Sequence, residues 1–136
     1  MNIIIDANIL ISGLIKDSST RKSLFSEKFN FYIPEYIITE VNKYIPEISE
    51  KAKLTQKEII NLFNLILEHL IIVPFNDYKE HLEKAVKIVA NIDEKDAQYI
   101  ALALFTKNNG IWSNDKHLKN QVNINVLTTK DMLNYL

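Results

Sequence analysis

Four acidic side chains lie at positions where they could act together on one substrate. Three isoleucines lead directly into Asp6, and Asp115 follows a second short apolar segment. Glu40 and Asp96 each lie on or beside the apolar face of a helical pattern. Open α/β sheets build their sites at the carboxyl ends of the strands, where side chains distant in sequence meet. The positions of these acids therefore predict a shared acidic site.

Gathering the acids in one place would have a direct chemical consequence. Neighbouring carboxylates repel one another, which raises their pKa values. A divalent cation removes that cost, and hard oxygen ligands favour Mg²⁺ or Mn²⁺ over zinc. Asp6 is the hardest of the acids to explain otherwise, because a buried carboxylate must be paired, hydrogen-bonded or bound to a cation. We therefore expect a Mg²⁺ or Mn²⁺ site that includes Asp6.

Each of the remaining residues also has an ordinary structural interpretation. Asp93 and Asp96 suit the first turn of a helix, where the helix dipole favours acids, and Asp115 suits the cap of a short helix. Glu40 alone would usually be a solvated helix residue, and Asn8 could simply hold a turn through its side chain. The case for chemistry therefore depends on the order of these residues along the chain.

The composition excludes several classes of site. The 136 residues include no cysteine, so disulfides and thiolate metal sites are excluded. Two glycines are too few for the glycine-rich loops that bind dinucleotides or nucleoside triphosphates. The net charge is −1, and only one basic residue is an arginine, Arg21. With no signal-like or membrane-spanning apolar segment in the sequence, we expect a soluble, cytoplasmic protein with a single domain over residues 1–136.

Short apolar runs alternate with helical patterns along the chain. This alternation predicts an α/β fold of three layers, α/β/α, around a mainly parallel five-stranded sheet. The expected strands are Ile3–Ile5, Phe29–Ile33, Ile71–Val73, Ile111–Ser113 and Asn125–Leu127. The expected helices are Ser18–Lys28, Glu35–Ile48 with a break at Pro46, Thr55–Leu70 with a capping box to Glu58, Asp77–Ala90, Asp96–Lys107 stopped by Gly110, a short one from Lys116, and Lys130–Leu136 capped by Thr128.

The order of these motifs resembles the PIN-domain family. The matching segments are Ile3–Asn8 (IIIDAN), Ile38–Val41 (ITEV), Asp93–Ala103 (DEKDAQYIALA) and Trp112–Asp115 (WSND). The resemblance runs from the first expected strand to the last expected helix, so it covers nearly the whole chain. It implies a metal-dependent ribonuclease with a five-stranded parallel sheet.

The resemblance also implies roles for single residues. Asp6, Asp96 and Asp115 would ligate Mg²⁺ or Mn²⁺, and Glu40 would complete the catalytic set directly or through water. The remaining positions that match the family would support these acids, and they are Asn8, Ser113 and Asp93. Lysines near the same edge would contact RNA phosphates, and the candidates are Lys16, Lys95 and Lys116.

The expected partners follow from the same resemblance and from two apolar helices. A compact chain of this kind is similar to the toxin members of the family, which pair with an antitoxin protein. The helical segments Thr55–Leu70 and Asp77–Ala90 carry more leucine and isoleucine than one sheet face needs, which predicts a homodimer or partner surface.

Two other functions are compatible with parts of the sequence. Phosphoryl transfer through Asp6 fits poorly, because the second acid of a D-x-D motif is Asn8 here, and Val73–Phe75 offers no phosphoacceptor after the third strand. A non-catalytic RNA-binding or protein-interaction module on the same fold is the remaining alternative, and metal binding would separate it from an enzyme.

Overall fold

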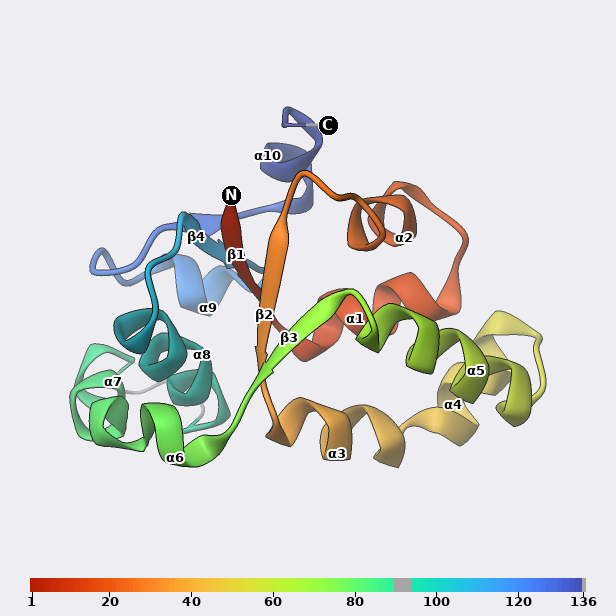
Figure 1. Ribbon diagram of the computed structural model, residues 1–136, viewed down its shortest axis with the longest axis horizontal. Helices are drawn as coiled ribbons and strands as arrows, with labels where there is room; N and C mark the ends of the chain where they lie inside the picture. The colour runs from red at the N-terminus through yellow and green to blue at the C-terminus, as the bar shows by residue number, and fades with distance from the viewer. Residues whose placement is uncertain (90–93, 136) are drawn as a thin grey trace.

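The sheet has five parallel strands in the computed structural model, which describes residues 1–89 and 94–135 (Figure 1). The strands are Asn2–Ile5 (β1), Asn30–Pro34 (β2), Leu70–Val73 (β3), Gly110–Trp112 (β4) and Val126–Leu127 (β5). Their order is β3-β2-β1-β4-β5, and every neighbouring pair is parallel. The predicted parallel α/β sheet is confirmed, with β1 at its centre.

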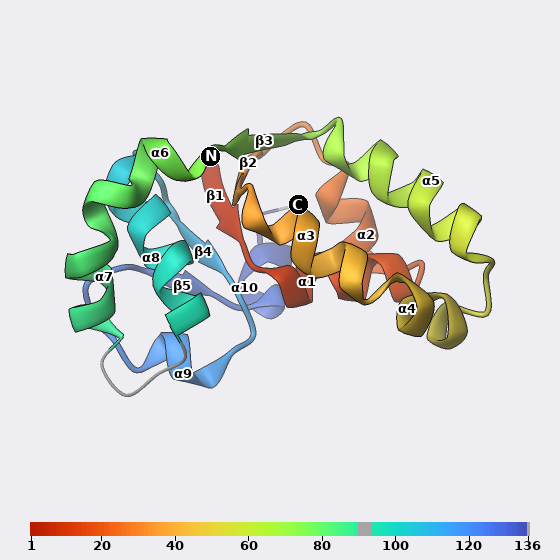
Figure 2. The ribbon, with the colours of Figure 1, turned by 90° about the horizontal axis from the view of Figure 1, so that it is seen from below.

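Helices flank the sheet on both sides, as the three-layer prediction requires. Their bounds are Ala7–Ile15 (α1), Ser19–Leu24 (α2), Tyr36–Lys43 (α3), Ile45–Ala52 (α4), Gln56–Leu67 (α5), Phe75–Tyr78 (α6), Leu82–Ile88 (α7), Glu94–Phe105 (α8), Lys116–Lys119 (α9) and Thr129–Leu133 (α10), with a 3₁₀ turn at Lys79–His81 (η1). Figures 1 and 2 show α6, α7 and α8 on one side of the sheet, and α1, α2, α4 and α5 on the other. No described helix is both long and apolar enough to cross a membrane.

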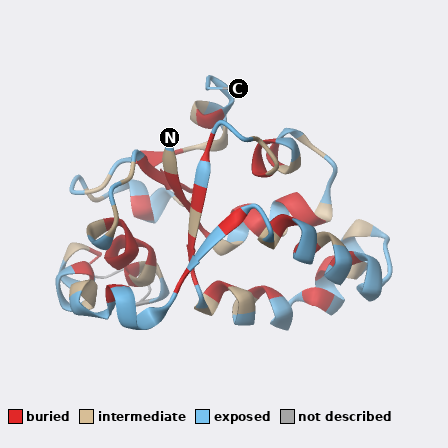
Figure 3. Cartoon of the chain, viewed as in Figure 1, coloured by how far each residue is buried: buried red, intermediate tan, exposed pale blue. Residues whose placement is uncertain are grey.

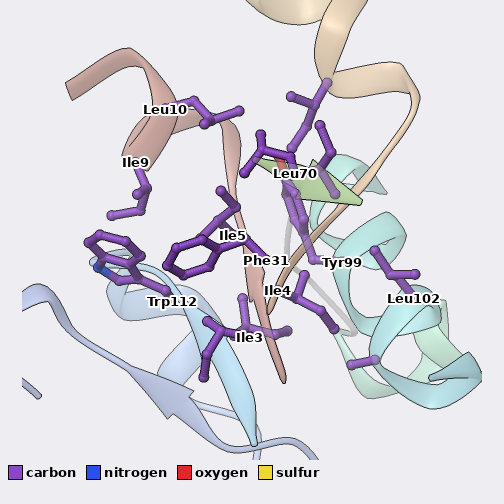
Figure 4. Close-up of a cluster of buried hydrophobic side chains, with 14 of the residues drawn as sticks. Ile3, Ile4, Ile5, Ile9, Leu10, Phe31, Leu70, Tyr99, Leu102 and Trp112 are labelled. Carbon is purple, nitrogen blue, oxygen red and sulfur yellow. The ribbon is translucent and has the colours of Figure 1, made fainter. Parts of the chain in front are cut away.

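The centre of the sheet is the most deeply buried part of the molecule (Figure 3). Ile3, Ile4 and Ile5 are fully buried, because helices cover both faces of β1. Figure 4 shows these side chains in one cluster with Phe31 and Trp112, whose rings lie 5.8 Å apart. Burying each isoleucine contributes about 1.5–3 kcal/mol. The apolar core thus fixes where β1 ends, and with it the position of Asp6.

The sequence prediction missed the first helix. Residues 7–15 form α1, which buries Ile9 and Leu10, although their apolar run had no recognised helical start. The cap that starts this helix is Asp6 itself. Capping motifs predicted elsewhere are confirmed: Thr55 and Thr128 both form capping boxes, and the chain breaks between α3 and α4 just before Pro46.

The third strand is less buried than predicted. Ile71 and Ile72 are 43% and 40% exposed, because β3 is an edge strand that pairs only with β2. Leu70 belongs to this strand and not to the preceding helix, which ends at Leu67.

The segment predicted as the helix Asp77–Ala90 is divided into α6, η1 and α7. The division buries Tyr78 completely, and its hydroxyl lies 2.6 Å from Gln98 Oε1 of α8. Ala90, the last residue of this prediction, lies outside the described residues.

Gly110 has a different role from the helix stop that we predicted. Helix α8 already ends at Phe105, and the Asn108 side chain donates to the carbonyl oxygens of Ala103 and Thr106. Gly110 begins β4 instead, with a φ of +146° that favours glycine. A Cβ atom there would meet the carbonyl oxygen of Asn125 at 2.9 Å.

Candidate active site at the carboxyl edge of the sheet

Asp6 joins the central strand to the first helix. Its Oδ1 atom accepts a hydrogen bond from the backbone N–H of Ile9 at 3.0 Å, which caps α1. Its Oδ2 atom accepts a hydrogen bond from the hydroxyl of Ser113, which follows β4. Only 5% of Asp6 is exposed. The predicted strand-end carboxylate is therefore present, buried and hydrogen-bonded through both oxygens.

The surroundings raise the pKa of Asp6 above its ordinary value of 3.8. Burial is the main cause, because it penalises the charged form, and the charge of Asp115 adds to it. The hydrogen bonds from Ser113 and Ile9 act in the opposite direction. The protein thus holds a carboxylate in a place that opposes its charge, and a bound cation would reverse that balance.

Asp115 lies next to Asp6 through a shared serine. Asp115 caps α9, and its Oδ1 atom accepts a hydrogen bond from the backbone N–H of His117 at 2.8 Å. Its own N–H donates to Ser113 Oγ at 3.0 Å. The hydroxyl of Ser113 therefore links the two aspartates, and the capping role foreseen for Asp115 is present.

Glu40 projects from α3 and is paired with two lysines. Lys43 Nζ lies 3.1 Å from Glu40 Oε1, and Lys95 Nζ lies 3.8 Å from Oε2. The Glu40 side chain is 15% exposed, whereas both lysines are more than half exposed, so water screens these pairs. Each pair contributes at most about 1 kcal/mol. The lysines therefore neutralise Glu40 without fixing it in place.

Two tyrosines lie between the acids. Tyr99 of α8 accepts a hydrogen bond from the N–H of Ala7 at 3.0 Å, and Tyr36 of α3 donates to the carbonyl oxygen of Lys95 at 3.3 Å. Their ring centroids are 5.9 Å apart. Burial raises the pKa of Tyr36, with a further contribution from the charges of Glu40 and Asp96. The pair connects α1, α3 and α8 beneath the acidic site.

A pocket of about 630 Å³ opens at this edge of the sheet. All four predicted acids line it: Asp6, Glu40, Asp96 and Asp115. Asn8 lines it from the first turn of α1, and Ser113 is fully buried between Asp6 and Asp115. Asp93 lies outside the described residues. The structure thus brings the four nominated acids, Asn8 and Ser113 to the same edge of the sheet.

The lysines agree less well with the sequence prediction. Lys95 lines the pocket, but the lining includes neither Lys16 nor Lys116, and Lys51 of α4 takes part instead. Sequence reasoning also missed Tyr36, which precedes Glu40 by one helical turn, and Tyr99, which follows Asp96 by three residues. Helical spacing from a nominated acid was the signal that could have found both tyrosines.

The donors in the pocket fit a hard divalent ion in their chemistry. All four acids offer carboxylate oxygens, which Mg²⁺ and Mn²⁺ prefer, and the site contains no sulfur ligand. Within residues 1–89 and 94–135, however, no three acidic, histidine or cysteine side chains stand close enough to hold one ion together. The side chains would therefore have to move closer together around an ion.

Comparison with known proteins identifies the family. A family model described as PIN domain matches residues 4–136. No curated protein matches the sequence. A similar fold occurs in the crystal structure of VapBC2 from Rickettsia felis bound to a DNA fragment from their promoter, with a TM-score of 0.74 and 13% sequence identity. That match covers 94% of this chain and 98% of the other. With the family model spanning nearly all of its length, this chain belongs to the PIN domain family.

Proposed function

We propose that this protein is a metal-dependent ribonuclease that hydrolyses RNA phosphodiester bonds. The proposal is supported above all by one observation: four acids from separate segments of the chain line one pocket, namely Asp6, Glu40, Asp96 and Asp115. Membership of the PIN domain family supports the same reading. A scaffold without catalysis would have no need to gather four acids and bury one of them at an electrostatic cost.

In this proposal Asp6, Asp96 and Asp115 hold Mg²⁺ or Mn²⁺, and Glu40 joins them directly or through a water molecule. The bound ion would polarise a phosphoryl oxygen and lower the pKa of the attacking water. Ser113 donates to the carboxylate of Asp6 and would orient it, and it accepts a hydrogen bond from the backbone N–H of Asp115.

The remaining nominated residues act around these acids. Asn8 lines the pocket beside Asp6 and would help to orient that carboxylate. Asp93 would supply an additional acid. Lys95 would exchange its contact with Glu40 for an RNA phosphate, because an exposed ion pair is weak enough to give way.

The biological setting that we propose is the toxin of a toxin–antitoxin pair, acting in the cytoplasm as one domain over residues 1–136. Its support is the family assignment together with a fold similar to part of VapBC2. Exposed apolar side chains supply a surface for an antitoxin or a second copy of the chain, and they include Ile60, Leu65, Ile71 and Ile72. A gene for a small DNA-binding protein should lie beside this one, and overexpression of the chain alone should arrest growth.

The decisive experiment incubates single-stranded and structured RNAs with the wild type and Asp6→Asn while Mg²⁺ or Mn²⁺ is titrated. We expect cleavage that needs the metal and the Asp6 carboxylate. Equal cleavage by both proteins would remove Asp6 from the mechanism. RNA binding without cleavage, and without Mn²⁺ binding by calorimetry, would favour the non-catalytic module instead.

A further inference from the structure

The pocket continues well beyond the four acids. Another part of it lies between α1 and α4, which contact each other and lie on the same side of the sheet (Figures 1 and 2). One wall follows a single face of α1, with Asn8, Ile11 and Ile15. The opposite wall comes from α3, from α4 and from Tyr44 between them, with Glu40, Tyr44, Ile48 and Lys51. Residues three or four apart within one helix share a face, as on α1, so the two walls form a groove beside the acids.

The groove combines apolar walls with an available aromatic ring. Tyr44 is 41% exposed, and its ring stacks on no other ring of the described residues. Ile48, on the same wall as Tyr44, is only 2% exposed, and Ile11 and Ile15 lie on the other wall. A flat ring beside aliphatic side chains suits a flat ligand that stacks.

The same groove carries a carboxylate, Glu47, and an ammonium group, Lys51, that form no ion pair with each other in the described part of the chain. Glu47 and Lys51 are four residues apart on α4 and line the groove together. The ion pairs of the described residues do not join them, although this spacing commonly gives a pair. A planar ligand with polar edges and an attached phosphate would satisfy both groups.

We propose that this part of the groove is a subsite for one unpaired nucleobase next to the cleaved phosphate. The inference rests on the proposed ribonuclease function and specifies its substrate as single-stranded at the site. Tyr44 stacks on the base, Glu47 accepts a hydrogen bond from its N–H edge, and Lys51 contacts a phosphate. Tyr44 follows Glu40 by four residues, just after the end of α3, and both side chains line the same pocket, which places the base beside the acids.

The test measures cleavage and binding of short single-stranded RNAs that differ only in the base beside the cleaved bond. Tyr44→Ala should raise KM about tenfold, because stacking of this kind is removed. Tyr44→Phe keeps the ring and should restore most of the loss. Tyr135→Ala removes a tyrosine of similar exposure, 46%, outside the groove, and should leave KM unchanged. Glu47→Ala should weaken the preference among bases, and Lys51→Ala should raise KM for every sequence alike.

Binding is measured in parallel by fluorescence anisotropy with Asp6→Asn as the background, so that RNA stays intact. Suppose that the wild type cleaves RNA but that Tyr44→Ala and Lys51→Ala have the same KM as the wild type. The proposed subsite is then wrong, although the proposed ribonuclease function is supported. If the wild type cleaves no RNA and no metal binds, the proposed function itself fails. Should Tyr44→Ala unfold, seen by thermal melting, Glu47→Ala and Lys51→Ala decide. If Tyr44→Ala no longer binds a purified protein partner but binds RNA as the wild type does, the groove recognises protein and the proposal is overturned.

Discussion

Asp6 and Asp115 follow neighbouring parallel strands and cap the helices that come next, but their surroundings differ. Asp6 accepts hydrogen bonds through both carboxylate oxygens and is almost completely buried. Asp115 caps a four-residue helix through Oδ1 and is only half-buried. Ser113 hydrogen-bonds to both residues. One local capping device thus occurs twice, once in the core and once at the rim of the pocket.

The difference shows what a cap alone requires. Serine and asparagine cap helices as well as aspartate does, without a charge to desolvate. At the position of Asp115 a carboxylate costs little, because water reaches it. At the position of Asp6 burial raises the pKa, so the charge opposes folding. A carboxylate kept there is therefore evidence for a role that needs the charge, and cation binding is the role we propose.

The largest expected effect comes from Asp6→Asn. Asparagine preserves the cap and the shape while it removes the charge. We expect cleavage to fall by more than about 100-fold, since supporting residues around metal sites alone are worth about 10–100-fold. The metal-free variant should melt no lower than the wild type, because a buried charge has gone. A large drop in melting temperature together with lost activity would point to a structural role.

Ser113→Ala should have the next largest effect. The change removes the hydrogen bond to Asp6 Oδ2 and the acceptor for the N–H of Asp115. We expect Mn²⁺ affinity and cleavage to fall about 10–100-fold, measured by calorimetry and by RNA cleavage. Ser23→Ala is a matched control, because Ser23 is also buried and donates to a backbone carbonyl in α2. Equal losses in both variants would show that Ser113 matters only for folding.

Tyr99→Phe should have a smaller effect on activity. The variant leaves the N–H of Ala7 without its acceptor, at the residue that follows Asp6. The lost hydrogen bond costs about 1 kcal/mol of stability, and we expect cleavage to slow several-fold as Asp6 loses its fixed position. Tyr78→Phe removes a hydroxyl from an equally buried ring away from the pocket, so it should cost stability with no change in cleavage.

The comparison of the two aspartates also explains how far the sequence could predict this protein. Three consecutive isoleucines gave a buried central strand and placed Asp6 at its end, because such a run fits little else. The capping box at Thr55 and the helix cap at Thr128 could be predicted in the same way from short local motifs. Features that depend on the arrangement of the whole sheet could not be predicted in this way. The exposure of Ile71, for example, follows from the place of β3 at the sheet edge, which no local pattern encodes.

Several residues that line the pocket could be nominated from the sequence, whereas the contacts among them could not be predicted. Four acids could be nominated from strand ends and helix faces, and all four line the pocket. The pairing of Lys95 with Glu40 and the ring contact between Tyr36 and Tyr99 depend on how α3 and α8 meet. Asp96 and Lys95 come from α8, whereas Glu40 and Tyr36 come from α3. Sequence spacing within either helix therefore could not supply those contacts.

The pH dependence of stability should show that the surroundings of Asp6 oppose its charge. The folded state binds the Asp6 proton more tightly than the unfolded state, because its pKa is raised. Its stabilising contribution is therefore complete below the ordinary value of 3.8 and is lost as the pH rises through the raised value. Urea unfolding with the metal chelated should show this decline, and Asp6→Asn should lack it.

Asp131 supplies the internal reference for that experiment. Its hydrogen bonds with Thr128 lower its pKa, so its contribution is present above 3.8 and is lost as the pH falls through the lowered value. The two effects occupy different sides of pH 3.8 and can be read separately. If Asp6→Asn keeps the decline above that pH, another group causes it.

The smallest expected effect comes from a cap that has no part in the site. Thr55 begins α5 with a hydrogen bond from the N–H of Glu58 at 3.1 Å, and it does not line the pocket. Thr55→Ala should cost about 1 kcal/mol of unfolding free energy, as caps usually do, and should leave cleavage and metal affinity unchanged. Chemical denaturation and the RNA assay measure the two quantities on the same preparation. Because Asp6→Asn is expected to do the reverse, keeping stability and losing cleavage, the two variants together distinguish a residue that only caps a helix from one that also bears a functional charge. A loss of cleavage in Thr55→Ala would mean that any weakened helix disturbs the pocket, and the contrast drawn between the two aspartates would no longer identify the active carboxylate.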